Sequence, residues 1–168
     1  GAGPFAAAVS DELQGVGMGD GRLVAELREV PPGATGADEV AFLIRPNAGL
    51  PFAPVAETAS GGELSRVALA IAAVAGGETL VFDEIDAGIG GRTANQVADT
   101  LVRLAARAQV ITITHLPQIA SRADLHLRVE KIPGDPTHTR IDELGEADRR
   151  DELERMLGGR EFLSTLER

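Results

Sequence analysis

Two short apolar segments in the middle of the sequence restrict its fold more than any other feature. Thr79–Phe82 (TLVF) and Gln109–Thr114 (QVITIT) are short and apolar, which is typical of buried strands. Apolar helical patterns precede each of them, over Glu63–Val74 and Arg92–Ala108. Strands that alternate with helices form parallel sheets through right-handed crossovers. The sequence therefore predicts an α/β fold with these two segments as central strands.

Antiparallel strands and two further helices are predicted outside this core. Alternating or apolar runs interrupted by proline and glycine are typical of β-hairpins, and two such pairs are present. Apolar residues at helical spacing near the start of the chain, and within a charged stretch near its end, predict two amphipathic helices. In chain order, these predictions are a short helix in the segment Phe5–Met18 that lies before the glycine-rich stretch Gly15–Gly21, strands over Arg22–Val30 and Glu39–Arg45 with Pro31–Gly33 between them, a loop over 46–54, strands over Leu125–Ile132 and Thr137–Leu144, and a helix over Glu146–Leu157.

The composition narrows the partners and metals that the chain can use. Its 168 residues with 43% hydrophobic content fit one compact domain, and no apolar run approaches the length of a membrane span. We therefore expect a soluble, intracellular protein without a membrane partner. The net charge of −10 argues against a large basic DNA-binding face. Since there is no cysteine, metal ligands would be carboxylates or histidines, and a hard ion is expected.

Ser60-Gly61-Gly62-Glu63 lies where a loop enters the first predicted core helix. Ser60 and Glu63 match a capping box, which explains both side chains without a ligand. The two glycines are not explained by capping, because each costs about 1 kcal/mol relative to alanine inside a helix. They indicate a close approach to the backbone. An anionic ligand is the natural candidate, since free amides and the helix dipole converge there.

Asp83, Glu84 and His115 follow the two predicted central strands, so they should lie at the carboxyl edge of the sheet, where open α/β folds bind ligands. Asp83 could bind Mg²⁺, and Glu84 could orient and deprotonate a water that attacks a terminal phosphate. His115 could donate a hydrogen bond to phosphate. The alternatives are a solvated acidic turn and a histidine used for packing or capping. The other two histidines, His126 and His138, are assigned no function.

Taken in order, these elements resemble the ABC ATPases, and among them the SMC-like branch. The segments ETASGGELSRVALAIA, LVFDEIDAGIGGRTA and QVITITHLPQIASRAD are most similar to the bacterial RecN family of double-strand-break repair proteins. With the helix between the last two, they cover most of Glu57–Asp124. The upstream stretch FLIRPNAG also resembles this family. The ordered occurrence of three motifs is far more specific than any one of them.

The resemblance implies a role for each candidate residue. Ser60, Gly61, Gly62 and Glu63 would form the signature loop, Asp83 would be the Walker B magnesium residue, Glu84 the catalytic carboxylate and His115 the switch histidine. The stretch 87–90 would be the D-loop, in which Gly90 stands where many ABC proteins have aspartate. That glycine puts in doubt a mechanism that depends on the D-loop carboxylate.

A Walker A loop, G-x-x-x-x-G-K-[ST], is absent, since the only lysine, Lys131, lacks a glycine-rich lead. The resemblance therefore implies the C-terminal lobe of an ABC/SMC-type head, with a mostly parallel sheet flanked by helices and additional antiparallel strands. Residues 1–20 would be the root of a coiled coil and a linker, and 21–168 the lobe. An N-terminal lobe of the same protein would supply Walker A.

The function implied is that of an ATPase half. With ATP and Mg²⁺ sandwiched between two heads of a homodimer, the complete protein would act on double-stranded or broken DNA, with recombination proteins as further partners, in the cytoplasm near the nucleoid. Two alternatives stay open. One is an ATP-gated structural DNA clamp with little catalytic role. The other is an interaction module that binds no nucleotide, in which SGGE only caps a helix.

Overall fold

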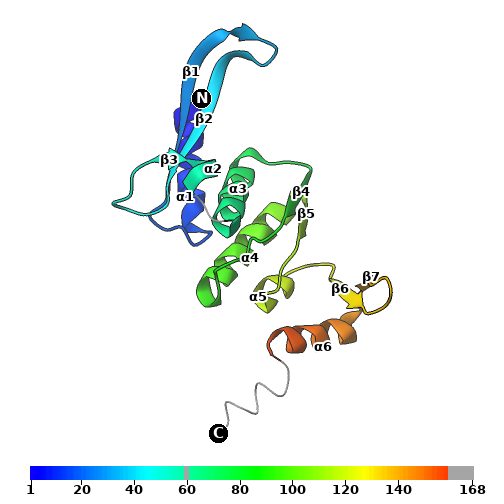
Figure 1. The fold of residues 1–168 in the computed structure, drawn as a ribbon. Coiled ribbons are helices and arrows are strands. Elements are labelled where there is room, and N and C mark those ends of the chain that lie inside the picture. The colour runs from blue at the N-terminus through cyan, green and yellow to red at the C-terminus, as the bar shows by residue number, and fades with distance from the viewer. Residues whose placement is uncertain (59–60, 159–168) are drawn as a thin grey trace. The chain divides into compact units, whose positions relative to one another are not determined.

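The computed structural model describes residues 1–58 and 61–158 (Figure 1). The chain divides into two compact units, Gly1–Thr114 and His115–Arg168, where the composition had suggested one. The first unit contains α1 (Ala2–Gln14), β1 (Arg22–Gly33), β2 (Gly36–Arg45), β3 (Ala53–Pro54), α2 (Val55–Thr58), α3 (Gly61–Ala75), β4 (Thr79–Phe82), α4 (Gly91–Ala105) and β5 (Gln109–Thr112). The second contains α5 (Pro117–Ala120), β6 (Leu127–Ile132), β7 (His138–Glu143) and α6 (Glu146–Met156).

The predicted parallel strands are confirmed, but their complete burial is not. β4 and β5 pair in parallel from Thr79 opposite Gln109 to Phe82 opposite Thr112. Phe82 is buried, whereas Val81 and Ile111 on the opposite face are 63% and 46% exposed. The reason is that, in the described part of the chain, this sheet has only two strands, and α3 and α4 cover one face of it. The other face is open.

The first predicted hairpin is longer than expected. β1 and β2 pair antiparallel from Arg22 opposite Arg45 to Gly33 opposite Gly36, so the turn lies beyond Pro31-Pro32-Gly33 instead of at it. Prolines cannot donate ladder hydrogen bonds, and the pairing is accordingly irregular between Glu29 and Gly33. Two elements were not foreseen, β3 within the predicted loop and α2 directly after it, because two and four residues are too few to show a period.

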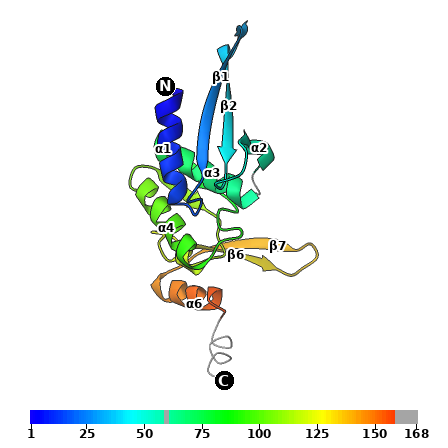
Figure 2. The same ribbon diagram turned by 90° about the vertical axis from the view of Figure 1, so that its left-hand side faces the viewer.

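Helix α1 packs on this hairpin, as both views show (Figures 1 and 2). Ser10 is buried and joins the two elements, because its Oγ accepts a hydrogen bond from the backbone N–H of Leu23 at 2.9 Å. The helix ends at Gln14, directly before the glycine-rich stretch Gly15–Gly21, as predicted. Gly17 adopts a left-handed φ of 78°, which no α-helix continues, and Val16 and Met18 are buried in the turn that follows.

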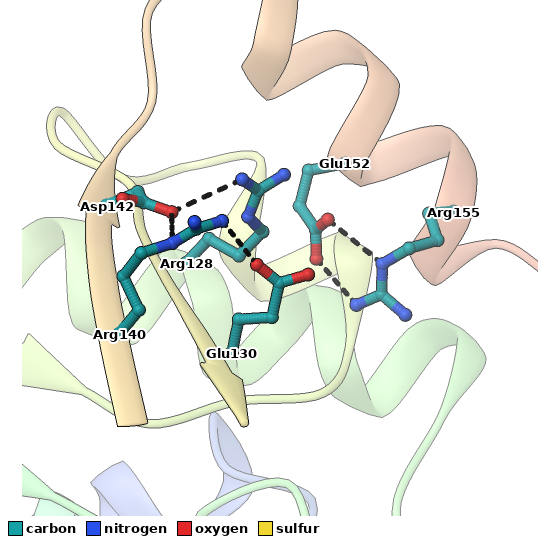
Figure 3. A network of polar contacts seen from close by, with 6 residues as sticks. All are labelled: Arg128, Glu130, Arg140, Asp142, Glu152 and Arg155. Atoms are coloured by element: carbon teal, nitrogen blue, oxygen red, sulfur yellow. Dashed lines mark hydrogen bonds and ion pairs between the residues drawn. The ribbon is translucent and has the colours of Figure 1, made fainter. Parts of the chain in front are cut away.

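The second unit is an antiparallel hairpin, β6–β7, followed by α6. Ion pairs hold one face of the hairpin, where Arg140 contacts both Glu130 and Asp142 (Figure 3). On α6, Glu152 is buried and pairs with Arg155 at 2.6 Å, which lowers the pKa of the Glu152 carboxyl. Leu157, expected on the apolar side of this helix, instead lies past its end and is 58% exposed.

Arg149 of α6 joins this helix to the start of the second unit. Its guanidinium donates hydrogen bonds to the backbone carbonyls of Ser121 and Ala123. Burial, with the nearby charge of Arg149, lowers the pKa of His126. This histidine therefore has a local packing explanation. Among the described helices, none is both long and apolar enough to cross a membrane.

Candidate functional site

The candidate site is built around the turn 83–87, which leaves the carboxyl end of β4. Asp83 and Glu84 are exposed, whereas the next two residues, Ile85 and Asp86, are buried. A carboxylate oxygen of Asp83 accepts the backbone N–H of Glu84 at 2.9 Å, and the N–H of Ala87 donates to the carbonyl of Glu84 at 3.0 Å. The turn thus presents two acidic side chains to solvent and anchors itself with the residues that follow.

Glu84 has an unusual backbone conformation. Its φ is +56°, in the left-handed region, and among the described residues it is the one non-glycine residue with positive φ. An L-residue in this region costs about 1–2 kcal/mol, because Cβ crowds the following carbonyl oxygen. Such strain persists only where the surroundings over-determine the conformation, and it is concentrated at functional sites. The turn must therefore be held from outside.

The first two turns of α3 hold it. Residues four apart lie on the same helix face, so Gly61 and Ser65 form one row and Gly62 and Arg66 the next. Ser65 Oγ donates to the carbonyl of Asp83 at 2.7 Å, and Arg66 Nη1 donates to the carbonyl of Ala87 at 3.0 Å. Side chains on one face of α3 therefore form hydrogen bonds to both ends of the acidic turn.

The glycines of α3 allow this close approach. A Cβ at position 62 would lie 2.7 Å from both the Cβ and the carbonyl oxygen of Ala87, closer than any side chain can tolerate. A Cβ at position 61 would meet only Glu84 Oε2, at 2.8 Å. The sequence had predicted a close approach to these glycines by a ligand. The chain itself supplies one such approach at Gly62, and the ligand role of the loop stays a prediction.

A third contact holds the turn from the β5 side. Thr114 Oγ1 donates to a carboxylate oxygen of Asp86 at 2.5 Å, and Asp86 is only 3% exposed. A buried carboxylate without partners would be costly, so this contact stabilises Asp86 inside the turn. Thr114 is also the residue before His115. The end of the first unit, just after β5, is therefore tied to the acidic turn.

The structure places some of the predicted site residues together but not all of them. Gly61, Gly62 and Glu63 form the first turn of α3, which lies against the turn that carries Asp83 and Glu84. Ser60 falls outside the described residues. His115 is exposed and opens the second unit, so its role as switch histidine stays a prediction.

The acidic turn fits magnesium. Among the described residues, no group of three or more histidines and carboxylates is placed to enclose a metal ion. Mg²⁺ is usually bound through one or two carboxylates, with substrate phosphates and waters completing its octahedron. Asp83 and Glu84, adjacent and exposed at a sheet edge, offer that kind of donor set. The site therefore suits a metal that arrives with a phosphate ligand.

Four supporting residues were missed from the sequence: Ser65, Arg66, Asp86 and Thr114. Two of them carried a signal, because Ser65 and Arg66 follow the signature glycines at a spacing of four. Arg66 also interrupts an otherwise apolar helix. Asp86 and Thr114 carried none, since 28 residues separate them and only the parallel pairing of β4 with β5 brings them together.

Known DNA repair proteins are similar to this chain. No family model matches the chain. The DNA repair protein RecN of Streptomyces coelicolor is 43% identical over 179 aligned residues, which cover 96% of this chain and 31% of that protein. RecN of Xylella fastidiosa is 45% identical over 86% of this chain and 27% of its own length. The chain belongs to the RecN family. It spans about a third of the length of these RecN relatives.

Solved structures confirm the fold. The Smc head domain with a coiled coil and joint from Pyrococcus yayanosii matches with a TM-score of 0.66 and 24% identity, over 90% of this RecN-family chain and 28% of that chain. An SMC ATPase structure from work on ATP-driven dimerization and DNA-stimulated activation matches with a TM-score of 0.58 and 20% identity, over 90% of both chains. The predicted fold, the C-terminal lobe of an ABC/SMC-type head with additional antiparallel strands, is therefore correct.

Proposed function

We propose that this chain is one half of an ATPase head that binds and hydrolyses ATP between two engaged heads during repair of DNA double-strand breaks. The observation that carries the proposal is the packing of the signature glycines of α3 against the acidic turn after β4. That packing gathers a helix N-terminus, suited to phosphate, and two exposed carboxylates within one local structure. RecN relatives named as DNA repair proteins support the biological role.

Each residue has a distinct part in this mechanism. Asp83 would hold Mg²⁺, which when bound neutralises charge on the phosphates. Glu84 would orient and deprotonate the attacking water, because its carboxylate is exposed at the sheet edge. His115 would hydrogen-bond the terminal phosphate of the same nucleotide. The Ser60–Glu63 loop would contact the nucleotide held by the second head, so that hydrolysis controls head engagement and the holding of DNA.

The open face of the β4–β5 pair supports the need for an N-terminal lobe. Val81 of β4 and Ile111 of β5 are 63% and 46% exposed, and Ile113, directly after β5, is 58% exposed. Such exposure is unusual for the apolar strands of a parallel sheet. The sequence also lacks a Walker A lysine loop. We propose that the lobe carrying Walker A packs on this face. A cytoplasmic, nucleoid-associated homodimer that binds double-stranded or broken DNA, with recombination proteins as further partners, completes the proposal.

The direct test is ATP hydrolysis by the complete protein. We expect turnover that requires Mg²⁺ and is lost when the metal is removed with EDTA, whereas this chain alone, without the lysine loop, should hydrolyse almost no ATP. Phosphate release measures both. If the complete protein neither binds nor hydrolyses Mg-ATP, the interaction-module alternative is favoured and the proposal fails.

Substitution of Ser60 by Arg tests the second head. A large cation in the loop should block its approach to the partner's nucleotide, so ATP-dependent dimerization should fall at least about tenfold, as expected for an uncompensated clash at an interface. Analytical ultracentrifugation with and without ATP measures it. Substitution of exposed Glu57 by Arg is the matched control, since it adds the same side chain three residues earlier. Unchanged dimerization of Ser60→Arg would reject the trans-acting signature.

A further inference from the structure

Arg66 is the most unusual side chain of the first unit that the proposed mechanism leaves unused. It lies in α3 among alanine, valine and leucine, and only 7% of its surface is exposed. Its neighbours Val67 and Leu69 are 1% and 0% exposed, as expected for the apolar side of a core helix. A guanidinium in such a place requires a reason, because arginine is almost never fully buried unless it is paired.

The partners of Arg66 do not amount to a stabilising ion pair. Nη1 donates to one backbone carbonyl, that of Ala87, at 3.0 Å, and Nε has no hydrogen-bond partner among the described residues. Burial lowers the pKa of the guanidinium, and the nearby charge of Glu63 only partly offsets this effect. An apolar side chain of similar volume would pack here at a smaller desolvation cost. Stability therefore does not account for the arginine.

The one strong contact of Arg66 leads to Glu84. Ala87, whose carbonyl receives the guanidinium, donates its own N–H to the carbonyl of Glu84 at 3.0 Å. Ala87 alone thus connects the guanidinium of Arg66 to Glu84, the residue whose φ is +56°. Because relaxation of that strained φ would swing the Glu84 side chain, a fixed Ala87 carbonyl keeps the carboxylate in place.

We propose that Arg66 is a positioning residue, which holds the Glu84 turn in its strained conformation through the carbonyl of Ala87 and so ties the catalytic carboxylate to the signature helix. This inference rests on the proposed ATPase function. It also links the signature helix of a head to the catalytic carboxylate of the same head. Arg66 lies one helical turn after Gly62, so any shift of α3 when its loop meets a nucleotide reaches the carboxylate of the same head through this contact.

The test compares Arg66→Met with Arg66→Lys in the complete protein. Methionine keeps an unbranched apolar stem but has no donor, whereas lysine keeps a cationic donor for the Ala87 carbonyl. We expect kcat for ATP hydrolysis to fall by about 10- to 100-fold in Arg66→Met, as for a small misplacement of a catalytic group, with KM within about twofold. Arg66→Lys should recover most of the loss. Arg103→Met, which removes an exposed ion pair with Glu12, is the control and should keep the wild-type kcat.

A double variant separates positioning from general destabilisation. If Arg66 acts through Glu84, adding Arg66→Met to Glu84→Gln should lower the residual single-turnover rate by less than about twofold, because the group being positioned is already impaired. Multiplied losses, or a wild-type kcat in Arg66→Met, would overturn the inference while leaving the ATPase intact. Thermal unfolding shows whether Arg66→Met folds. If it does not, the kcat of Arg66→Lys tests the inference, and a value close to wild type is expected. Absence of ATP hydrolysis by the wild-type protein would overturn both proposals.

Discussion

Substitution of Glu84 by Gln is expected to lower ATP turnover by the complete protein by at least about 100-fold, while Mg-ATP binding stays within a few-fold of wild type. A positioned general base contributes about 10²–10⁴-fold to a rate, and the amide of glutamine cannot take the proton of the attacking water. Because Gln has the same shape, the hydrogen bonds of the turn should survive. Steady-state phosphate release and nucleotide-binding titrations measure the two quantities.

The matched control for this variant is Glu78→Gln. Glu78 is an exposed glutamate at the opposite end of β4, so its substitution makes the same chemical change away from the site. It should turn over ATP at the wild-type rate. A wild-type rate in Glu84→Gln would remove the catalytic role of Glu84. DNA retention separates the clamp alternative: if the stalled variant holds DNA as well as the wild-type protein does, ATP binding alone is enough for the clamp.

Substitution of Gly62 by Ala is expected to have the second large effect, and on stability as well as on turnover. The added methyl group would lie 2.7 Å from the Cβ and the carbonyl oxygen of Ala87, so helix and turn must separate. Overpacking of this kind costs about 1–3 kcal/mol, more than the roughly 1 kcal/mol that alanine contributes as a better helix former. A turn displaced by about 1 Å should also lower kcat on the order of 100-fold.

The control for Gly62→Ala lies one residue earlier. At Gly61 the added methyl group would meet only Glu84 Oε2, the mobile end of an exposed side chain. The free energy of unfolding of Gly61→Ala should therefore match or exceed that of the wild type. Chemical denaturation compares the two variants. Equal stability of Gly61→Ala and Gly62→Ala would contradict the tight packing of α3 on the acidic turn.

The predictions that succeeded from sequence concern local patterns. β4 was predicted with its observed bounds, and α3 and α4 with limits wrong by only a few residues, because each has a clear period and recognisable ends. The limits failed where proline acts through three-dimensional context. The turn of the first hairpin lies past Pro31-Pro32-Gly33, because β1 continues through these residues. That outcome is not encoded by a residue type alone.

The sequence by itself determined which residues are candidates for chemistry, and through the order of three motifs it determined the family. It also showed that a lysine loop is missing. Only the tertiary structure revealed what holds Glu84 in its strained conformation. Three side chains hydrogen-bond to the acidic turn, and each is far in sequence from its partner there. The separations are 18 residues for Ser65, 21 for Arg66 and 28 for Thr114. Such contacts depend on how α3, β4 and β5 pack, and packing between elements leaves no period in a single sequence.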